Sequence, residues 1–463
     1  MKIIVLNGSP KGEISVTMQY VAYIQKEFPQ HEFKILHITQ QMNKLESDNQ
    51  FWNKTMEDIK SAAGIVWAFP LYVFLVHGNY KRFIELIFER EAQANFLGKH
   101  TAIVTTSIHF YDHTAHNYIQ GICDDLHMMF YATFSAEMQD LFKEKERVKL
   151  VQFSQHFFAG INRNIPASQV FPPLIPPNLD YSPGSNSVPL NVCGQKVVVL
   201  TDAEPQQTNL KGMIEKITAS FGSRIEVVNL HDIDIKGGCL GCIRCGYDNT
   251  CIYQDKDGFS AVYNDKLKNA DILIFAGTIK DRYLSSLWKT FFDRAFFNTH
   301  KPSFAGKQIA FLVSGPLKQL ANLRQIFEAY TEWQQANLVG IVTDEAEDSE
   351  QLDARITELA LRSMDYASCR YVKPPTFLGV GAIKVFRDEI WGALRFPFIA
   401  DHQYYKSNGL YDFPHHDYAT RLRNGILGWL VKVPAIRKKI YSSVLIHKMV
   451  EPYRKLLDHT RNK

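Results

Sequence analysis

The chain lacks any run of apolar residues close to the ~18 that a membrane-spanning helix needs, and it lacks a strong net charge. Its 463 residues carry 52 lysines and arginines against 48 aspartates and glutamates, which gives no indication of a nucleic-acid partner. Seven cysteines are few for a disulfide framework. Hydrophobic residues make up 46% of the sequence, which excludes wholesale disorder. We therefore expect a globular protein of two or three domains.

The first residues contain only a short apolar run. Lys2–Leu6 is followed at once by the turn sequence Asn7-Gly-Ser-Pro10, which indicates a strand that enters a turn and not a signal peptide. We therefore expect a cytoplasmic protein with reduced cysteines.

Short apolar runs alternate with amphipathic segments, a pattern typical of a parallel sheet covered by helices on both faces. The pattern occurs twice, and the first strands of the two series begin about 194 residues apart. The predicted strands are Lys2–Leu6, Phe33–Leu36, Gly64–Phe69, Thr101–Thr105 and Tyr131–Ser135 in the first series, and Lys196–Leu200, Ile225–Leu230, Asp271–Phe275, Gln308–Val313 and Asn337–Val342 in the second. We predict a tandem duplication of one doubly wound α/β unit.

Proline and charge mark the remaining boundaries. Seven of the 19 prolines lie between residues 166 and 189, where their fixed φ and missing N–H predict an extended linker. Residues 371–463 hold 16 lysines and arginines against 7 aspartates and glutamates, and they are rich in aromatic residues. The predicted domains are two α/β units at 1–162 and 194–368, a proline-rich linker at 163–193, and a basic, aromatic, helical extension at 369–463.

The function of the basic extension has three interpretations. The stretch around Trp429 resembles an amphipathic helix that lies at a membrane surface. The alternatives are a helix that packs on the first α/β unit with a solvated basic face, and a docking site for an acidic redox partner.

The loop after the first strand has the composition of a phosphate-binding turn. It reads Asn7-Gly-Ser-Pro-Lys11, and Ser15-Val-Thr17 opens the next helix. Open α/β sheets bind ligands outside the carboxyl ends of their strands, where a helix N-terminus offers unpaired N–H groups. The glycine patterns of dinucleotide folds and P-loops are absent, which disfavours NAD-type and ATP-type sites. The alternative is that Ser15 only caps the helix.

Together with Pro70-Leu-Tyr-Val73 after the third strand, this loop resembles the NAD(P)H-dependent FMN reductase family of flavodoxin-like proteins over residues 1–135. The resemblance implies an α/β fold of two tandem flavodoxin-like, doubly wound, five-stranded parallel sheets, followed here by the C-terminal helical extension. It also implies that FMN is bound by three loops. Its phosphate would be held by Ser9, Lys11, Ser15, Val16 and Thr17; its ring would be lined by Pro70, Leu71, Tyr72 and Val73, with Ser107 and His109 near the edge.

Four cysteines lie within thirteen residues of the second unit, in a C-x2-C-x2-C-x5-C spacing. Structural zinc more often uses two separated pairs, so this spacing favours a [4Fe–4S] cluster, with zinc and unmetallated thiols as alternatives. The expected ligands are Cys239, Cys242, Cys245 and Cys251. A cysteine motif after the second strand of a flavodoxin-like domain resembles the iron–sulfur flavoproteins, a branch of the same family.

The two units differ at the phosphate loop. The second unit has Thr201-Asp-Ala-Glu-Pro205 where Gly-Ser-Pro is expected, so carboxylates replace the phosphate-binding groups. We therefore expect FMN on the first unit and the cluster on the second. The iron–sulfur flavoproteins that this sequence resembles bring one subunit's cluster close to another's flavin, and the fused pair would make that arrangement internal, as a pseudo-dimer.

The expected function is an NAD(P)H-dependent flavin oxidoreductase that moves electrons through FMN and a [4Fe–4S] cluster, without a catalytic nucleophile or base. NAD(P)H would stack on the flavin as a transient donor; a ferredoxin-type donor is the alternative, and a homo-oligomer is compatible with the pattern. The competing functions are a cluster-free NAD(P)H:FMN or quinone reductase, and a non-catalytic electron-transfer protein or redox sensor.

Overall fold

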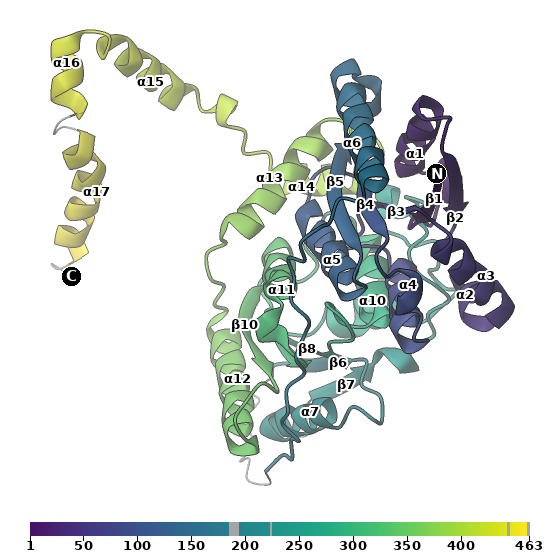
Figure 1. The fold of residues 1–463 in the computed structure, drawn as a ribbon. Coiled ribbons are helices and arrows are strands. Elements are labelled where there is room, and N and C mark those ends of the chain that lie inside the picture. Colours follow the sequence, from purple (N-terminus) through teal and green to yellow (C-terminus); the bar gives the residue numbers. More distant parts are fainter. Residues whose placement is uncertain (185–193, 223–224, 442–444, 461–463) are drawn as a thin grey trace. The chain divides into compact units, whose positions relative to one another are not determined.

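The computed structural model describes residues 1–184, 194–222, 225–441 and 445–460. It contains two five-stranded sheets in which all paired strands are parallel (Figure 1). The strand order is β2-β1-β3-β4-β5 in the first sheet and β7-β6-β8-β9-β10 in the second. This shared order is that of a flavodoxin-like doubly wound fold. The predicted fold class is confirmed, and so is each of the ten predicted strands.

The helices and strands follow one another in the same sequence in both halves. The first half contains β1 (Lys2–Asn7), α1 (Val16–Glu27), β2 (Glu32–Leu36), α2 (Met42–Ser47), α3 (Asn49–Lys60), β3 (Gly64–Pro70), α4 (Gly78–Glu89), β4 (His100–Ser107), α5 (Asp112–Asp125), β5 (Met129–Glu137) and α6 (Glu144–Arg163). The second contains β6 (Val197–Thr201), α7 (Thr208–Phe221), β7 (Ile225–Asn229), α8 (Cys245–Asp248), α9 (Phe259–Val262), β8 (Ile272–Thr278), α10 (Ser286–Ala295), β9 (Gln308–Ser314), α11 (Ala321–Trp333), β10 (Asn337–Thr343) and α12 (Ser349–Cys369). The extension contains α13 (Phe377–Trp391), α14 (Ile399–Ser407), α15 (Tyr418–Leu430), α16 (Pro434–Lys439) and α17 (Leu445–Thr460).

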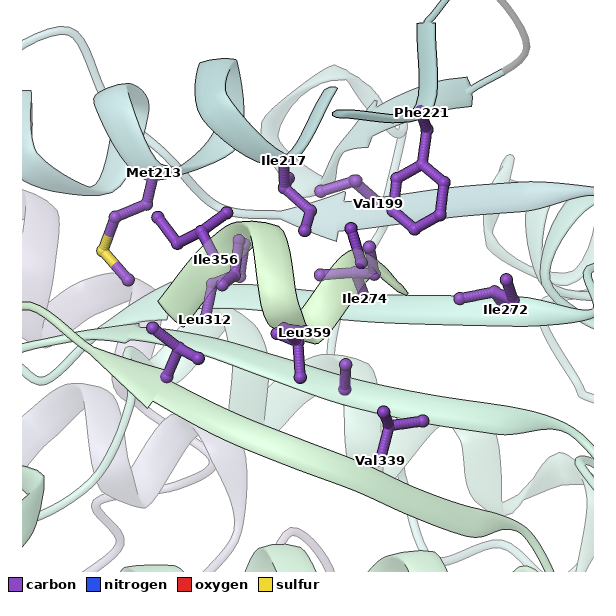
Figure 2. Packing of buried hydrophobic residues seen from close by; sticks show 14 of the residues in the cluster. Val199, Met213, Ile217, Phe221, Ile272, Ile274, Leu312, Val339, Ile356 and Leu359 are labelled. Atoms are coloured by element: carbon purple, nitrogen blue, oxygen red, sulfur yellow. The ribbon is translucent and has the colours of Figure 1, made fainter. Parts of the chain in front are cut away.

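One face of each sheet is covered by two helices of the same half. On the second sheet these are α7 and α12; Figure 2 shows side chains of the shared core, among them Ile217 of α7, Leu359 of α12 and Ile274 of β8. On the first sheet they are α1 and α6. Burying one such side chain contributes about 1.5–3 kcal/mol. These cores explain why the strands read as continuous apolar runs.

The helices on the opposite faces join the two halves, and α4 packs against its counterpart α10. The N–H of Gly78, which opens α4, donates to Asp293 of α10 at 2.8 Å. In return, the N–H of Ser286, which opens α10, donates to Glu85 of α4 at 2.6 Å. Each helix thus supplies the acceptor for the other's unpaired N-terminal donor. In a two-fold symmetric dimer, each subunit makes the same contact to the other. Here the two halves of one chain make such a reciprocal pair of contacts.

Buried ion pairs strengthen the contact between the halves. Lys81 of α4 is fully buried and lies 2.8 Å from both Glu85 and Asp281, the latter from the loop after β8. Arg282 of the same loop forms a bidentate pair with Asp125 at the end of α5, with both N–O distances 2.7 Å. Removing one member of such a set leaves a buried charge unpaired, which costs about 3–5 kcal/mol.

The linker has no regular secondary structure from residue 166 to residue 184, as its prolines predict. It is nevertheless held in place, since Tyr181 is buried in the core of the second half and donates a hydrogen bond to Asp353 at 2.5 Å. The rest of the linker, with Cys193, lies outside the described residues.

The chain divides into two compact units, Met1–Tyr404 and Tyr405–Lys463. Both sheets belong to the first unit, and so does the beginning of the C-terminal extension. Glu332 of α11 accepts hydrogen bonds from the N–H groups of Thr376 and Gly379, at 2.8 and 2.9 Å, and so fixes the start of α13. The predicted boundaries at residues 162, 193 and 368 stay predictions. In the part of the chain that the structure describes, no helix is both long and apolar enough to cross a bilayer.

Candidate functional site

The loop after β1 and the N-terminus of α1 form a polar cradle at the carboxyl edge of the first sheet. Ser9, Ser15 and Thr17 are 1%, 4% and 0% exposed. Ser15 is the N-cap of α1, and its hydroxyl accepts a hydrogen bond from the N–H of Met18 at 3.3 Å. The N–H groups of Val16 and Thr17, in the first turn of α1, have no carbonyl one turn earlier with which to pair. They are the donors that a bound anion would use.

The predicted hydroxyl donors of this cradle already have partners. The Ser9 hydroxyl accepts from the N–H of Lys11 at 3.2 Å, and the Thr17 hydroxyl shares a 2.6 Å hydrogen bond with that of Thr106 at the end of β4. The Ser15 side chain caps α1, and the predicted phosphate-binding role of these residues stays a prediction. The hydroxyl hydrogens of Ser9 and Ser15, the ammonium group of Lys11 and the backbone N–H groups remain to donate.

Gly8 lets the loop lie close to the sheet. A Cβ atom at this position would come within 2.8 Å of the Phe69 Cβ atom and 3.1 Å of the Tyr80 ring. The strand registers place Asp202 at the equivalent position of the second half and Gly277 at that of Phe69. At this contact the first half has glycine in the loop and phenylalanine in the strand, whereas the second half has aspartate in the loop and glycine in the strand. The loop of the second half therefore carries a carboxylate where the first half has no side chain.

The second predicted loop, after β3, forms a tight turn. Tyr72 and Leu75 exchange two backbone hydrogen bonds of 2.8 Å, and Val73 and Phe74 between them have φ values of 27° and 65°. Side chains with a Cβ atom rarely adopt such a conformation, which costs about 1–3 kcal/mol for each residue. The Phe74 side chain is buried, with its ring 6.0 Å from that of Trp333 of α11. The second half therefore holds the strained turn in place.

The third loop, after β4, places Ser107 and His109 at the same edge. The Ser107 hydroxyl accepts from the N–H of His109 at 2.9 Å, and the His109 ring lies 2.8 Å from Asp112. Burial alone would raise the pKa of Asp112, but hydrogen bonds from His109 and Ser135 lower it. The three loops meet because the strands that carry them, β1, β3 and β4, are parallel neighbours in the sheet.

The cysteine segment of the second half, residues 237–251, which we term the cysteine loop, lies on these loops of the first half. The ring Nε2 of His77 and the carbonyl oxygen of Cys239 are 2.8 Å apart, so the ring donates this hydrogen bond. A Cβ atom at Gly241 would overlap the Tyr72 hydroxyl and lie 3.1 Å from Cε of Lys11. The structure therefore brings together two sets of residues that the sequence places more than 150 residues apart.

Arg294 of α10 anchors the cysteine loop and was not predicted from the sequence. Its guanidinium donates to the Gly237 carbonyl at 2.9 Å and to the Asp257 carboxylate at 2.8 and 3.0 Å, and it stacks on the Tyr253 ring with 4.3 Å to the centroid. Both charged side chains are fully buried. Burial alone would raise the pKa of Asp257, but Arg294 holds it below its ordinary value.

The four cysteines of the loop are free thiols. Burial is the main cause that raises the pKa of Cys239 and of Cys245 to about 12, and neighbouring thiols add to it at both, with Asp293 adding to it at Cys239. Across the described ranges of the chain, no three His, Cys, Asp or Glu side chains are grouped so that they could hold a metal ion. The structure therefore gives no support to the expected iron–sulfur cluster or to zinc as its alternative.

The equivalent edge of the second half is a polar cavity of about 530 Å³. Asp202 and Glu204 line it from the loop after β6, and Arg82 and Glu89 line it from α4 of the first half. Burial raises the pKa of Asp202, whose carboxylate accepts a hydrogen bond from the Ser285 hydroxyl. Carboxylates at this place oppose a phosphate electrostatically.

A comparison with protein families gives one match, to the NADPH-dependent FMN reductases, over residues 1–138 and 196–346. The two segments together cover more than half of the chain. The chain belongs to the NADPH-dependent FMN reductase family. The double match confirms both the predicted resemblance and the tandem duplication. The expectation of an enzyme, an NAD(P)H-dependent, FMN-containing oxidoreductase, is confirmed by this membership.

Solved structures similar to this chain each cover about one third of it. The flavoenzyme NAD(P)H:(acceptor) oxidoreductase FerB of Paracoccus denitrificans shares 17% identity over 35% of this chain and 98% of its own, with a TM-score of 0.31. General stress protein 14 of Treponema denticola, in complex with FMN, shares 10% over 35% and 98%, with a TM-score of 0.26. An NADPH-quinone reductase of P. pentosaceus shares 14% over 34% and 96%, with a TM-score of 0.27. No curated protein matches the chain significantly. The fold assignment rests on the strand order and the family match, since these scores are low.

Proposed function

We propose that the chain is an NAD(P)H-dependent oxidoreductase that binds FMN at the carboxyl edge of its first sheet, beneath the cysteine loop of its second half. The observation that carries this proposal is the contact of that loop with Lys11, Tyr72 and His77, next to the helix N-terminus that suits a phosphate. Gly8 lets the loop that would hold the phosphate lie close to Phe69 and Tyr80.

Different residues of the first half would bind the phosphate and the ring of FMN. The N–H groups of Val16 and Thr17 and the ammonium group of Lys11 would hold the phosphate. The turn at Pro70–Val73 would present backbone groups and the Tyr72 ring to the flat heterocycle, and the cysteine loop would exclude water from it. When bound, FMN supplies the capacity to accept a hydride from NAD(P)H and to pass electrons to an acceptor.

A finer form of the proposal adds a [4Fe–4S] cluster at Cys239, Cys242, Cys245 and Cys251. It is supported by the cysteine spacing and by the position of the loop against the first half, but not by the arrangement of the thiols. Protein purified without oxygen distinguishes the two forms. Iron and sulfide at about four per chain support the cluster, and flavin without iron supports a cluster-free reductase of FMN or quinones.

Two charge variants test the FMN site. Lys11→Gln removes one charged hydrogen-bond donor, worth about 1.5–3 kcal/mol, so the dissociation constant for FMN is expected to rise roughly 10- to 100-fold. Lys26→Gln, at an exposed position of α1, is the matched control and is expected to leave it unchanged. Equal FMN affinities of the two variants, measured by quenching of flavin fluorescence, would contradict the proposed site.

Reduction of the flavin tests the activity itself. Under anaerobic conditions NADPH or NADH is expected to bleach the flavin absorbance of the holoprotein. Bleaching by dithionite alone would favour a ferredoxin-type donor, or an electron-transfer protein or redox sensor, over a nicotinamide-dependent enzyme.

A further inference from the structure

The second compact unit, residues 405–463, differs in charge from the rest of the chain. It holds 12 lysines and arginines against 4 aspartates and glutamates, although the whole chain has a net charge of only +4. Arg437, Lys438 and Lys439 are consecutive in α16, and all three are exposed. The unit therefore presents a dense positive charge, whereas residues 1–404 are acidic on balance.

Helix α15 carries large apolar side chains on its surface. Tyr418, Leu422 and Trp429 are 71%, 69% and 68% exposed, and Ile426 is 54% exposed. Their spacing of four and three residues places them on a single face of the helix. Arg421 and Arg423 lie on either side of that face by the same periodicity. In a folded domain such a face is buried, yet α15 and α16 contain no buried residue.

Helix α17 repeats the pattern. Met449 and Tyr453 are 64% and 68% exposed, and Leu456 and Leu457 are 62% exposed. These positions share one face of the helix, and Arg454 and Lys455 follow on the polar side. Exposed apolar faces on two helices of one small unit mark an interaction site in a natural protein.

We propose that residues 405–463 bind the surface of an anionic lipid bilayer. The apolar faces of α15 and α17 would enter the boundary between headgroups and acyl chains, and the basic side chains would contact the headgroup phosphates. Tryptophan and tyrosine favour that boundary, because their rings are apolar with one polar group. The contact is peripheral, since none of the helices within the described residues can span a bilayer.

Two other partners fit the same surface less well. A second copy of the unit would bring a net charge of +8 against an equal charge, which opposes association. An acidic protein would be recognised through the arginines and lysines, but it gives no reason for Leu422 and Trp429 to be exposed on one face. A bilayer accounts for the charge and the apolar face together.

Cosedimentation of the full chain with vesicles tests the proposal. Vesicles of phosphatidylcholine with one quarter phosphatidylglycerol are expected to bind the chain at least ~10-fold more tightly than phosphatidylcholine alone. Replacing Arg437, Lys438 and Lys439 by glutamine is expected to weaken binding roughly fivefold for each charge removed. Leu422→Ser is expected to weaken it roughly 10-fold or more, whereas Phe142→Ser, at an 85% exposed position of the first unit, is expected to change nothing.

Quenching by brominated lipid reports insertion directly. Tryptophan fluorescence of the wild type is expected to be quenched on binding; Trp429→Phe is expected to abolish the quenching, and Trp391→Phe, in α13, to retain it. Equal binding to neutral and anionic vesicles, or loss of binding in the Phe142 control, would overturn the proposal. So would an absence of vesicle binding combined with capture by an acidic protein or with self-association. Retention of flavin by each variant shows that the first unit is folded and keeps the outcome separate from that of the proposed FMN site.

Discussion

Arg294→Met should detach the cysteine loop from its anchor, and the structure gives the size of the effect. Arg294 makes one hydrogen bond to Gly237 and two to Asp257, between 2.8 and 3.0 Å, with both charged groups fully buried. Methionine fills much of the same volume but leaves the Asp257 carboxylate buried with only two long contacts, from the N–H groups of Lys236 and Phe259 at 3.2 and 3.3 Å. We expect a loss of about 3–5 kcal/mol in the free energy of unfolding.

The dependence of this loss on pH follows from the carboxylate. In the wild type Arg294 depresses the pKa of Asp257, so the pair stabilises the fold above the ordinary pKa of ~4 and loses this contribution as the pH falls through the lowered value. In Arg294→Met the burial of Asp257 raises its pKa instead. The deficit of the variant should therefore be largest at pH 7 and shrink as the pH falls towards ~4.

The assay compares the midpoints of urea unfolding at pH 7 and pH 5, together with the FMN affinity. Arg294→Met with Asp257→Asn should recover most of the lost stability, because no charge is then buried alone. Arg244→Met breaks an exposed pair with Asp248 in the same loop and should change the midpoint little, because exposed ion pairs contribute little to stability. Equal midpoints for the Arg294 and Arg244 variants, or no recovery in the double variant, would refute the anchoring role.

Three further substitutions test how the halves shape the site. Phe74→Ala should lower the free energy of unfolding by about 3–5 kcal/mol, because the turn loses the packing of Phe74 on Trp333. It should also weaken FMN binding for the same reason. Thermal unfolding measures the loss of stability, and FMN titration measures the loss of affinity. Glu85→Ala should lower the free energy of unfolding by about 3–5 kcal/mol, since it leaves Lys81 with one carboxylate and the N–H of Ser286 without an acceptor. A loss below about 1 kcal/mol in urea unfolding would contradict a stabilising role of this buried contact between the halves. Gly241→Ala should lower the free energy of unfolding by about 1–2 kcal/mol, because φ at this position is +62°. It should also weaken FMN binding, because the added methyl group pushes the cysteine loop away from the first half. Unchanged FMN affinity would argue against the contact of this loop with the FMN site.

Much of the architecture could be predicted from the sequence, for a physical reason. Strands of a parallel sheet are buried on both faces, so they read as apolar runs such as Gly64–Phe69, and the predicted strands agree with the observed ones to within a few residues. The topology of the sheet then brings the loops after β1, β3 and β4 to one edge. The predicted FMN residues are near one another for this reason.

The contacts between the halves could not be predicted in the same way. His77 and Cys239 are 162 residues apart, and neither lies in a pattern that points to the other. Arg294 reads in the sequence as an ordinary charge in the last turn of a helix, and only its burial beside Asp257 reveals its role. Val73 and Phe74 are residue types that disfavour positive φ, so their turn becomes intelligible only once the aromatic side chains of α11 are in view.

The cysteine spacing shows a limit of motif reasoning. The interval between the four thiols predicts a metal centre; within the described residues they are not grouped so that they could hold one ion, so the structure does not support the cluster and it stays a proposal. The Thr17 hydroxyl makes a 2.6 Å hydrogen bond to that of Thr106, which the sequence does not reveal, and the phosphate-binding role of Thr17 stays a prediction.

A crystal structure of the full chain grown with FMN tests the central claim most directly. The account predicts a flavin phosphate at the N-terminus of α1 beside Lys11, with the ring beside the turn at Pro70–Val73 and covered by the cysteine loop. A flavin in the cavity beside Asp202, with nothing bound at Ser9, would contradict it.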